Sequence, residues 1–374
     1  MNDFSGVLHV YVGNRFGGIE TMLATMARSP LFAGQSYALL YPGRLYDEIR
    51  AAGADVEQIG GFRARKPWQA LAVRKRLREV LAARRVHTIV THMAIPHALV
   101  APVAGARKIV YYAHEYHRGT HWSERWARLG RWPDLVIAGS AFDAESVPSI
   151  FPGLPTRVVY YAAELAARGS DEERAAVRRE LATPLDHRVI LSAARLTPYK
   201  GHEVLIEALG LLRERAGWTA WVAGAPQIPA EVELFARLKA RVQALSLGER
   251  VRFLGERRDV PRLSSAADLA CQANVGPEPF GLCFIEALAA GVPVVTSGIG
   301  GALEIVTPEV GELVPPGNAR ALAEGLARCM DSEQKAVAAQ TLGPERARML
   351  CSAAAFAERL GSAIDEARGS RPRV

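Results

Sequence analysis

The sequence predicts an α/β protein with two Rossmann-like domains, each built on a doubly wound parallel sheet. Short β-rich runs alternate with helical stretches of roughly 10 to 15 residues, which is the pattern of repeated βαβ units. The chain has 374 residues, too many for one ordinary core and a comfortable number for two. A stretch rich in Ala, Arg and Glu, residues 162–186, separates two complete βα series. We therefore expect an N-terminal domain over residues 1–168 and a C-terminal domain over residues 169–351.

The first series starts with an apolar run at 7–12, which leads through a glycine-rich turn into a helical run at 19–28. Further β-rich runs in this half lie at 88–92, 108–112, 135–138 and 157–160. In the second half they lie at 188–193, 218–223, 251–254, 269–272 and 294–296. The final segment, 352–368, is rich in Ala and helical in pattern. Parallel sheets bind ligands at the carboxyl ends of their strands, so we expect a site in the cleft between the domains.

Composition excludes several classes of protein. With 49% apolar and 23% charged residues, the chain is globular rather than disordered. No run approaches the roughly 20 apolar residues that span a bilayer, and the N-terminus lacks a basic region followed by an apolar core. We therefore expect a cytoplasmic protein without a secretory signal. The four cysteines form no Cys-x-x-Cys pair and no zinc spacing, so we expect reduced thiols at Cys271, Cys283, Cys329 and Cys351.

The segment 276–295, Gly-Pro-Glu-Pro-Phe-Gly-Leu-Cys-Phe-Ile-Glu-Ala-Leu-Ala-Ala-Gly-Val-Pro-Val-Val, carries the clearest functional signal. Its two prolines keep the loop extended after a predicted strand, and Gly281 permits a close approach of the backbone to a ligand. A helix is predicted from Phe280 to Ala290. Free amides at its start would stabilise an anion at the carboxyl edge of the sheet.

Two glutamates flank this helix start. Glu278 lies on the loop just ahead of it, and Glu286 lies inside the helix. A carboxylate among apolar helix neighbours needs a hydroxyl partner, because burial without one costs free energy. A ribose diol supplies such a partner. The alternative is a plain helix acid beside a chance glutamate, and the agreement of the loop with both acids favours a ligand site.

A second candidate site is the segment 192–201, Ser-Ala-Ala-Arg-Leu-Thr-Pro-Tyr-Lys-Gly, directly after a predicted strand. Arg195 and Lys200 therefore share one loop at the carboxyl end of the sheet. Two cations there suit a diphosphate whose negative charge grows as a glycosidic bond breaks. The alternative is a pair of solvated loop cations, and the segment around Glu278 favours the functional interpretation.

Further candidate residues follow four other predicted strands. Gly17 and Gly18 allow a tight turn and an approach to phosphate, but the segment 13–18 is not a Gly-x-Gly-x-x-Gly dinucleotide fingerprint. His114 follows the strand at 108–112, where a structural role is the competing interpretation, and Ser140 is a weaker candidate after the next strand. Gly255 ends the Phe-Leu-Gly turn after the run at 251–254.

Together these motifs resemble the retaining GT-B glycosyltransferases, and in particular their large family four, the group 1 glycosyl transferases. Two glutamates eight apart around Pro-Phe-Gly, followed by Glu-Ala-Leu-Ala-Ala-Gly-Val-Pro-Val-Val, resemble the family's E-x7-E signature. Gly-Gly at 300–301 with Glu-Ile-Val at 304–306 extends the match. The Arg and Lys-Gly of 195–201 and the Gly-Gly-x-Glu of 17–20 also fit. The resemblance is strong over residues 188–316 and diffuse over 7–160, and it implies the GT-B fold with a central cleft.

The resemblance implies a donor site for a nucleotide-diphosphate sugar. Glu278 would contact the transferred sugar, and Glu286 would bind the ribose. Arg195 and Lys200 would stabilise the diphosphate. Sugar hydroxyls and the β-phosphate would be held by the backbone amides of Phe280, Gly281, Leu282 and Cys283.

The resemblance also assigns roles outside that segment. Gly17 and Gly18 would lie near the donor pyrophosphate and the acceptor, and His114 would face the sugar. Gly255 would lie beside the base. The N-terminal domain would carry the acceptor contacts. The C-terminal helix, about 352–374, would cross back to the N-terminal domain.

Two departures from the family's pattern stand out. Where the family has Pro-Ser after a strand, this chain has Cys-Gln-Ala-Asn-Val-Gly at 271–276, which leaves the contacts of the donor sugar open. Where the family has Asn-Gly at the domain crossing, this chain has Tyr-Ala-Ala at 161–163.

Basic residues concentrate between Gly61 and Arg85, where nine cations surround a single acid, and the whole chain has a net charge of +7. Within 68–85, apolar residues fall on one stripe of a predicted helix. One interpretation is a solvated helix packed on the sheet. The other is attachment to an anionic membrane surface through Arg63 to Arg85, on the inner face of the membrane. The segment lacks interleaved aromatic residues and known nucleic-acid motifs, so we expect no nucleic-acid partner.

We therefore expect a retaining glycosyltransferase that moves a sugar from a nucleotide-diphosphate sugar to an acceptor hydroxyl. The acceptor would be a glycan, a lipid-linked saccharide or a small molecule in polysaccharide or glycoconjugate biosynthesis. The sequence holds no Asp-x-Asp element, so we expect no metal and no other cofactor. Two alternatives stay open: a related nucleotide-sugar epimerase or phosphorylase, and a non-catalytic basic binding protein.

Overall fold

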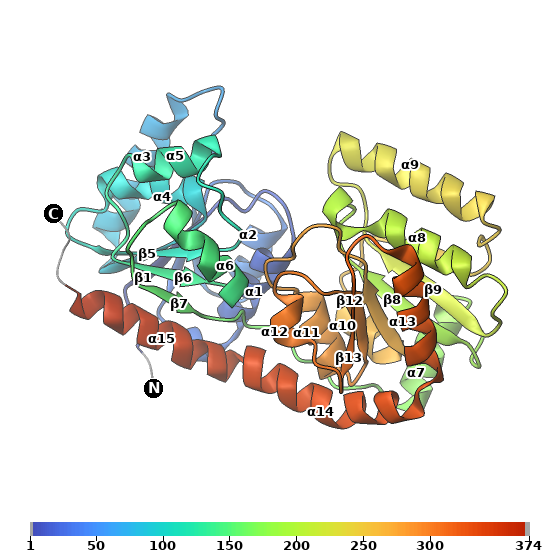
Figure 1. The fold of residues 1–374 in the computed structure, drawn as a ribbon. Coiled ribbons are helices and arrows are strands. Elements are labelled where there is room, and N and C mark those ends of the chain that lie inside the picture. Colours follow the sequence, from blue (N-terminus) through green and yellow to red (C-terminus); the bar gives the residue numbers. More distant parts are fainter. Residues whose placement is uncertain (1–2, 371–374) are drawn as a thin grey trace. The chain divides into compact units, whose positions relative to one another are not determined.

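A computed structural model of the chain describes residues 3–370 (Figure 1). Internal contacts divide it into two compact units. The first comprises the chain up to Ala163 together with the segment from Ala353 onward, and the second is Glu164–Ser352. Both are parallel-sheet α/β units, which confirms the predicted fold class. The division falls at Ala163, whereas the sequence pattern placed it after residue 168.

The sheet of the first unit has seven strands in the order β3-β2-β1-β4-β5-β6-β7, and every neighbouring pair is parallel. Chain order reverses between β1 and β4, so this is the point where a doubly wound sheet opens a crevice at its carboxyl edge. The strands are β1 Val7–Tyr11, β2 Ser36–Leu39, β3 Asp55–Gln58, β4 Thr88–His92, β5 Lys108–Ala113, β6 Leu135–Ala138 and β7 Thr156–Val158.

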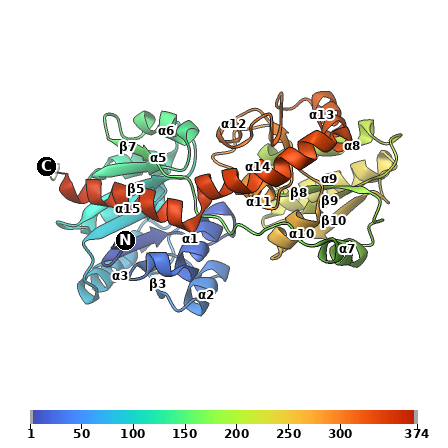
Figure 2. The ribbon, with the colours of Figure 1, turned by 90° about the horizontal axis from the view of Figure 1, so that it is seen from below.

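Helices cover both faces of this sheet (Figures 1 and 2). The final helix belongs to this unit, because Phe356 packs against the ring of Phe32 at 5.6 Å and Arg157 pairs with Glu366 at 2.9 Å. The helices are α1 Gly18–Arg28, α2 Arg44–Ala51, α3 Gln69–Ala83, α4 Ala94–Val100, α5 Trp122–Arg128, α6 Ala141–Ser146 and α15 Ala353–Gly369.

The sheet of the second unit has six parallel strands in the order β10-β9-β8-β11-β12-β13. Chain order reverses here between β8 and β11. The strands are β8 Arg188–Ala193, β9 Trp218–Ala223, β10 Val251–Gly255, β11 Leu269–Gln272, β12 Val294–Ser297 and β13 Gly311–Val314. The helices are α7 Asp171–Glu180, α8 His202–Leu211, α9 Pro229–Ala244, α10 Val260–Ala266, α11 Leu282–Ala289, α12 Ala302–Ile305, α13 Ala319–Asp331 and α14 Glu333–Cys351.

The strands of the second unit are buried on both faces because successive side chains point to opposite sides. Ile190 and Val222 join one apolar cluster, and Leu191 and Trp221 join the cluster on the other face. Each fully buried side chain of this size contributes roughly 2 kcal/mol of transfer free energy. The covered sheet therefore holds the carboxyl ends of β8 and β11 side by side as a rigid base for the loops that follow.

Helix α11 is fixed from behind by α14. A Cβ on Gly343 of α14 would lie 2.7 Å from the carbonyl oxygen of Leu288, so glycine is needed for this close crossing. Arg346, on the same helix, donates to the carbonyl oxygens of Ile305 at 2.5 Å and Glu304 at 2.7 Å. The crossing at Gly343 therefore fixes α11, and Arg346 ties α12 to the same helix.

Candidate active site

Two loops meet at the carboxyl edge of the second sheet, one after β8 and one after β11. Gly201 closes the first loop with a φ of +68°, and a Cβ there would collide with the carbonyl oxygen of Ala273 in the second. The amide of Val275 donates to the carbonyl oxygen of Tyr199 at 2.9 Å. Glycine and this backbone bond therefore bring the turn that carries Lys200 directly against the loop that leads to Glu278.

Lys200 and Glu278 form an ion pair between these loops. The Glu278 residue is 9% exposed, and its Oε2 also accepts a hydrogen bond from Gln272 Nε2 at 3.2 Å. Burial lowers the pKa of Lys200, but the carboxylate of Glu278 together with Tyr199 and Cys283 raises it by more, so that pKa lies above its usual value. Lys200 is therefore a fixed positive charge. The carboxylate of Glu278 beside it is held in place by Lys200 and Gln272 and is partly desolvated.

The backbone of Glu278 is held by a pair of glycines. Glu278 forms a parallel bridge with Gly300, and the amide of Gly301 donates to the carbonyl oxygen of Glu278 at 2.8 Å. A Cβ on Gly301 would lie 2.6 Å from the carbonyl oxygen of Phe280. The Gly-Gly of the sequence motif thus lets the loop after β12 pack against the loop that carries Glu278.

Helix α11 begins at Leu282, two residues later than the sequence suggested. Gly281 has a φ of +106°, which lies outside the helical region and so delays the helix. The amide of Phe284 donates a hydrogen bond to the carbonyl oxygen of Gly281 at 3.0 Å. Within residues 3–370, the amides of Gly281, Leu282 and Cys283 donate to no protein acceptor. Three free donors and the positive end of the helix make this an anion-binding edge.

Glu286 is half-buried on α11, and its carboxyl group has no hydrogen-bond or ion-pair partner in the described part of the chain. Burial raises the pKa of its carboxyl to about 7, and repulsion from Glu164 adds to this shift. A desolvated carboxyl without donors is unfavourable. The position therefore suits a ligand that brings hydroxyl groups.

Arg195 is also half-buried, and its guanidinium makes no hydrogen bond or ion pair with any other described residue. Its main chain is anchored, because its carbonyl oxygen accepts from His202 Nε2 at 3.0 Å and from the amide of Thr197 at 2.8 Å. An unpaired guanidinium on a fixed backbone is suited to an anionic ligand. Arg195 follows β8, as Lys200 does.

Gly255 ends β10 with a φ of +68° at an irregularity in the pairing with β9. Its carbonyl oxygen accepts from the amide of Gly224 at 2.8 Å. In the order of the sheet, β10 lies two strands from β8, so Gly255 is at the side of the edge and not at its centre.

The remaining predicted site residues lie in the first unit, again at the carboxyl ends of strands. Gly17 caps α1 and Gly18 is its first residue, directly after β1. Nearby, the Tyr11 hydroxyl donates to Glu20 Oε1 at 2.7 Å. His114 follows β5, two strands from β1 in the sheet. Ser140 is buried and caps α6, because its Oγ accepts from the amide of Asp143.

His114 is buried, and protein groups occupy both of its ring nitrogens. Its Nε2 lies 2.8 Å from His92 Nδ1, and its Nδ1 lies 2.7 Å from the Tyr161 hydroxyl. Burial lowers the pKa of His114 to about 3, so its imidazole is neutral. The sequence led us to expect this ring to face a sugar, but in this structure neither nitrogen is available to a ligand.

Sequence reasoning missed the polar network behind Glu278. Gln272 Nε2 donates to Asn274 Oδ1 at 2.7 Å as well as to Glu278, and Gln272 Oε1 accepts from Cys283 Sγ at 3.0 Å. The Nδ2 of Asn274 is buried without a hydrogen-bond partner among the described residues. The signal was present as Gln-Ala-Asn at the end of β11, because buried polar side chains there are costly unless they serve the site.

Two negative findings concern residues 3–370. No three side chains of His, Cys, Asp or Glu there are grouped in a way that could hold a metal ion. No helix in that part of the chain is both long enough and apolar enough to cross a membrane.

Two parallel-sheet, Rossmann-like units joined in one chain define the GT-B architecture. Residues 173–346 match the family model described as glycosyl transferases group 1. This part of the chain is therefore a group 1 glycosyl transferase domain, and the resemblance seen in the sequence is confirmed.

Similar proteins agree with that assignment. D-inositol 3-phosphate glycosyltransferase of Corynebacterium glutamicum is 32% identical over 210 residues, which is 54% of this chain and 49% of the relative. The lipopolysaccharide core mannosyltransferase LpsB of Rhizobium meliloti is 28% identical over 246 residues, 64% of this chain and 66% of the relative. The chain thus spans about half to two thirds of the length of these relatives.

A solved structure covers nearly the whole chain. HepE of Anabaena in complex with UDP-glucose superposes with a TM-score of 0.84 and 25% sequence identity, covering 96% of this chain and 99% of HepE. The fold of both units is therefore that of HepE.

Proposed function

We propose that the chain is a retaining glycosyltransferase that moves a sugar from a nucleotide-diphosphate sugar to an acceptor hydroxyl without a bound metal. One observation carries this proposal. An unpaired guanidinium at Arg195, the Lys200–Glu278 pair and the free amides that start α11 converge on the edge between β8 and β11. That edge is the switch point of the sheet, where doubly wound folds bind their ligands.

The donor would lie along this edge. Its diphosphate would take the positive charges of Arg195 and Lys200 and the amides of residues 281–283. Its ribose diol would donate to the carboxyl group of Glu286, which meets no donor in the described chain. Burial raises the pKa of that carboxyl to about 7, which reflects the cost of burying it without a donor. Its base would lie toward Gly255. The transferred sugar would contact Glu278.

UDP and GDP are the nucleotides to compare first. HepE, at 25% identity, was solved with UDP-glucose. A GDP-mannose-dependent phosphatidylinositol monomannoside mannosyltransferase of Corynebacterium glutamicum is 26% identical over 275 residues. The two relatives point to different nucleotides, so the donor class is decided by experiment.

The chemistry follows from where charge develops. As the bond between the sugar and the diphosphate breaks, negative charge grows on the leaving oxygen, and preorganised cations and amides stabilise it more than they stabilise the bound donor. The acceptor hydroxyl would attack from the same face and give its proton to the departing phosphate. The acceptor contacts would come from the first unit, near Gly17 and Gly18. Arg195, Lys200 and the amides supply the positive charge, so no divalent cation is required.

The proposal is tested by binding and product analysis on the whole chain. A thermal-shift panel of UDP, GDP, ADP and TDP should give one clearly preferred nucleotide, because a ligand of the folded state raises its stability. Lys200→Ala should abolish that shift. Lys239→Ala, an exposed lysine on α9 of the same unit, is the matched control and should keep it. A shift that survives Lys200→Ala would place the diphosphate elsewhere.

Product analysis separates the proposal from its alternatives. Transfer with an unchanged anomeric configuration supports a retaining transferase. An epimerised donor in the absence of acceptor would indicate an epimerase, and Schiff-base absorbance of pyridoxal phosphate would indicate a phosphorylase. Binding of a nucleotide sugar with neither transfer nor conversion would indicate a non-catalytic binder.

We also propose that the first unit rests on an anionic membrane surface. Of the nine cations between Gly61 and Arg85, seven are exposed, and Arg76 is the one of these that forms ion pairs. Within residues 3–370 the side chains of the other six make no ion pair or hydrogen bond: Arg63, Arg65, Lys66, Lys75, Arg78 and Arg85. The predicted apolar stripe of α3 is buried against the sheet, as a solvated helix would require. Trp68 and Leu71, however, are 62% and 68% exposed beside these cations.

This face continues onto α5. Phe62 packs on the ring of Trp126 at 5.0 Å, and Trp122 of the same helix is exposed. Arg125 is exposed beside it. Exposed tryptophan and leucine among unpaired cations suit the interface of a membrane, where indole rings lie at headgroup level and cations meet anionic lipid.

A further inference from the structure

A chain of buried polar side chains runs through the first unit from β2 to the end of β7. None of its members is more than 6% exposed. Along the chain of hydrogen bonds they are Tyr37, Gln35, His9, His92, His114 and Tyr161, which we call the histidine relay.

Every link of the histidine relay has hydrogen-bond length. His9 Nδ1 lies 2.9 Å from His92 Nε2, and His92 Nδ1 lies 2.8 Å from His114 Nε2. At one end His114 Nδ1 lies 2.7 Å from the Tyr161 hydroxyl. At the other end His9 Nε2 lies 3.0 Å from Gln35 Oε1. The three rings also stack, with centroids 5.1 to 5.2 Å apart.

The three imidazoles are neutral. Burial lowers the pKa of His9 to about 4 and that of His114 to about 3, and it lowers the pKa of His92 as well. A neutral imidazole carries one hydrogen, so it donates through one nitrogen and accepts through the other. The histidine relay therefore has a single direction, because a reversed ring in the middle would set two hydrogens or two lone pairs against each other.

Gln35 fixes that direction. Its Nε2 donates to the Tyr37 hydroxyl at 2.6 Å, which leaves its Oε1 to accept from His9. His9 must then carry its hydrogen on Nε2 and accept on Nδ1 from His92 Nε2. The same reasoning puts the hydrogen of His114 on Nε2, and its Nδ1 accepts from the Tyr161 hydroxyl.

Tyr161 is the first residue of the Tyr-Ala-Ala that departs from the family's pattern. Its ring fits against the chain only because residue 139 is glycine: a Cβ on Gly139 would lie 2.5 Å from the Tyr161 hydroxyl. Gly139, His114 and Tyr161 are therefore matched to one another, which gives a physical account of the departure.

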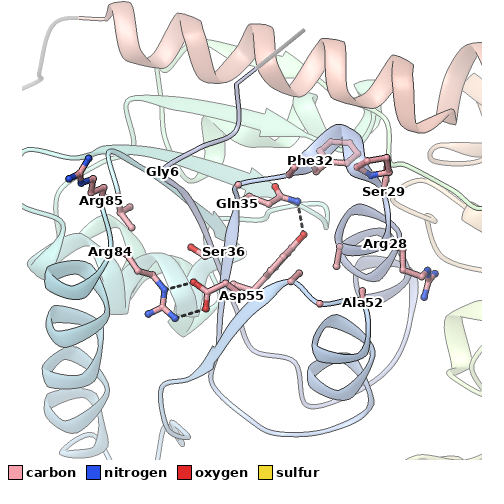
Figure 3. A pocket seen from close by; sticks show the side chains of 18 residues that line it. Gly6, Arg28, Ser29, Phe32, Gln35, Ser36, Ala52, Asp55, Arg84 and Arg85 are labelled. Carbon is pink, nitrogen blue, oxygen red and sulfur yellow. Dashed lines mark hydrogen bonds and ion pairs between the residues drawn. The ribbon is translucent and has the colours of Figure 1, made fainter.

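The opposite end of the histidine relay lies at a cavity of about 600 Å³ (Figure 3). Gln35 and Tyr37 line it. So do Asp55 and Arg84, whose ion pair has a bond of 2.6 Å. The cavity is at the amino edge of the sheet, where β2 and β3 begin, whereas His114 is at the carboxyl edge. The relay thus connects the two edges of one sheet.

We propose that Gln35, His9 and His92 are positioning residues that fix the Nε2–H tautomer of His114 and turn the hydroxyl hydrogen of Tyr161 inward. A role of the His114 tautomer toward an acceptor at the carboxyl edge rests on the proposed function. The tautomer itself is independent of the proposed function, because it follows from the hydrogen bonds of the first unit.

The proposal predicts an effect at a distance. Gln35→Met removes the acceptor for His9 Nε2–H and leaves a buried donor unpaired, which proteins tolerate less well than an unpaired acceptor. Reversing all three rings lets His114 Nδ1–H donate to the Tyr161 oxygen. The unpaired hydrogen then lies on the Tyr161 hydroxyl, which can rotate about its C–O bond as a ring N–H cannot. The single change at residue 35 should therefore move the hydrogen of His114 from Nε2 to Nδ1, three rings away.

The test is a long-range proton–nitrogen correlation spectrum of the whole chain with 15N-labelled histidine, recorded without substrate. In the native protein His9, His92 and His114 should each show a protonated Nε2 and an unprotonated Nδ1. In Gln35→Met, with a native-like amide spectrum, all three should reverse. A native-like variant whose His114 keeps Nε2–H would overturn the proposal, and so would mixed tautomers in the native protein. Gln35→Leu serves the same purpose if the methionine variant does not fold.

Two further variants complete the experiment. Tyr37→Phe removes the hydroxyl that accepts from Gln35 Nε2, so the Gln35 amide can turn over and the three histidines should no longer hold a single tautomer. Tyr161→Phe keeps the ring that fits against Gly139 but removes the hydroxyl, so only the Nδ1 resonance of His114 should move. Because no donor or acceptor substrate is added, absence of glycosyl transfer would leave these outcomes unchanged, and the two proposals fail separately.

Discussion

Lys200 and Glu278, 78 residues apart in the chain, form an ion pair that joins the loops after β8 and β11. Each is assigned to a different part of the proposed donor, the lysine to the diphosphate and the glutamate to the sugar. Without a donor, the two groups neutralise each other and stay desolvated together. Binding of a diphosphate must therefore compete with Glu278 for Lys200.

This competition predicts opposite effects on binding and on transfer. Glu278→Gln should bind the preferred nucleoside diphosphate at least as tightly as the native chain, because Lys200 loses its anionic competitor. Its rate of transfer should fall by about 100-fold, the size typical of losing one preorganised polar contact. Calorimetry and product formation measure the two quantities. Equal losses in both would mean that Glu278 mainly holds the loop.

Glu286 predicts a dependence of stability on pH. Its folded pKa of about 7 lies above the ordinary value of 4.5, so the folded protein holds this proton more tightly than the unfolded chain does. The contribution to the free energy of unfolding is complete below about pH 4.5 and is lost as the pH rises through about 7. Glu286→Gln cannot ionise, so it should melt a few degrees above the native chain at pH 8 and level with it near pH 4.5.

The matched control for this titration is Glu345→Gln, an exposed glutamate on α14 of the same unit. It should leave the melting temperature unchanged at both pH values. A Glu286→Gln curve parallel to the native one from pH 4.5 to 8 would contradict the raised pKa.

We expect substitution of Gly201 to lower both the stability of the protein and its affinity for the nucleotide. Both Gly201 and Gly217 have positive φ, +68° and +74°, but a Cβ on Gly217 meets nothing within 4 Å. Gly217→Ala should therefore cost only the strain of the left-handed conformation, about 1 to 2 kcal/mol. Gly201→Ala adds a collision with Ala273 and should cost more, while weakening nucleotide binding. Chemical denaturation and the thermal shift with UDP or GDP distinguish the two variants.

The membrane proposal predicts salt-sensitive flotation. The native chain should float with vesicles that contain phosphatidylglycerol at low salt, and less at high salt, because each cation near the surface contributes about 1 kcal/mol. Charge reversal at Lys75 and Arg78 should abolish flotation. Serine at Trp68 and Leu71 should weaken it even at low salt. Val232→Ser, an exposed apolar residue on α9, is the control and should float normally.

For this prediction the contradicting outcome is equal recovery with neutral and anionic vesicles. That outcome would mean that α3 is a solvated helix packed on the sheet and does not bind a membrane.

The predicted runs include ten of the thirteen strands within residues 3–370, and the three missed strands are β2, β3 and β13. β1, β8 and β9 are largely apolar and buried, and covered parallel strands have this signature. β3 reads Asp-Val-Glu-Gln and is exposed or half-exposed along its length, so neither burial nor alternation marks it. Its pairing with β2 supplies the strand, and a pairing partner cannot be read from four polar residues.

In the candidate site, the residues of local motifs could be predicted, and the hydrogen bonds between distant segments could not. Glu278, Glu286, Arg195 and Lys200 could be named because each belongs to a local motif on a loop or helix start. The hydrogen bonds of Gln272 to Glu278 and of Tyr161 to His114 could not. They depend on how one loop folds back on another, and in the second case the partners are 47 residues apart.

Helix α15 belongs to the first unit, although it follows the second unit in the chain. The second unit is a contiguous stretch, whereas the first is assembled from two separated stretches. During synthesis the second unit can therefore finish folding while the first still lacks the helix that covers Phe32. Until α15 arrives, that apolar surface is open to other molecules, so the risk of aggregation during synthesis lies with the part of the chain that emerges first.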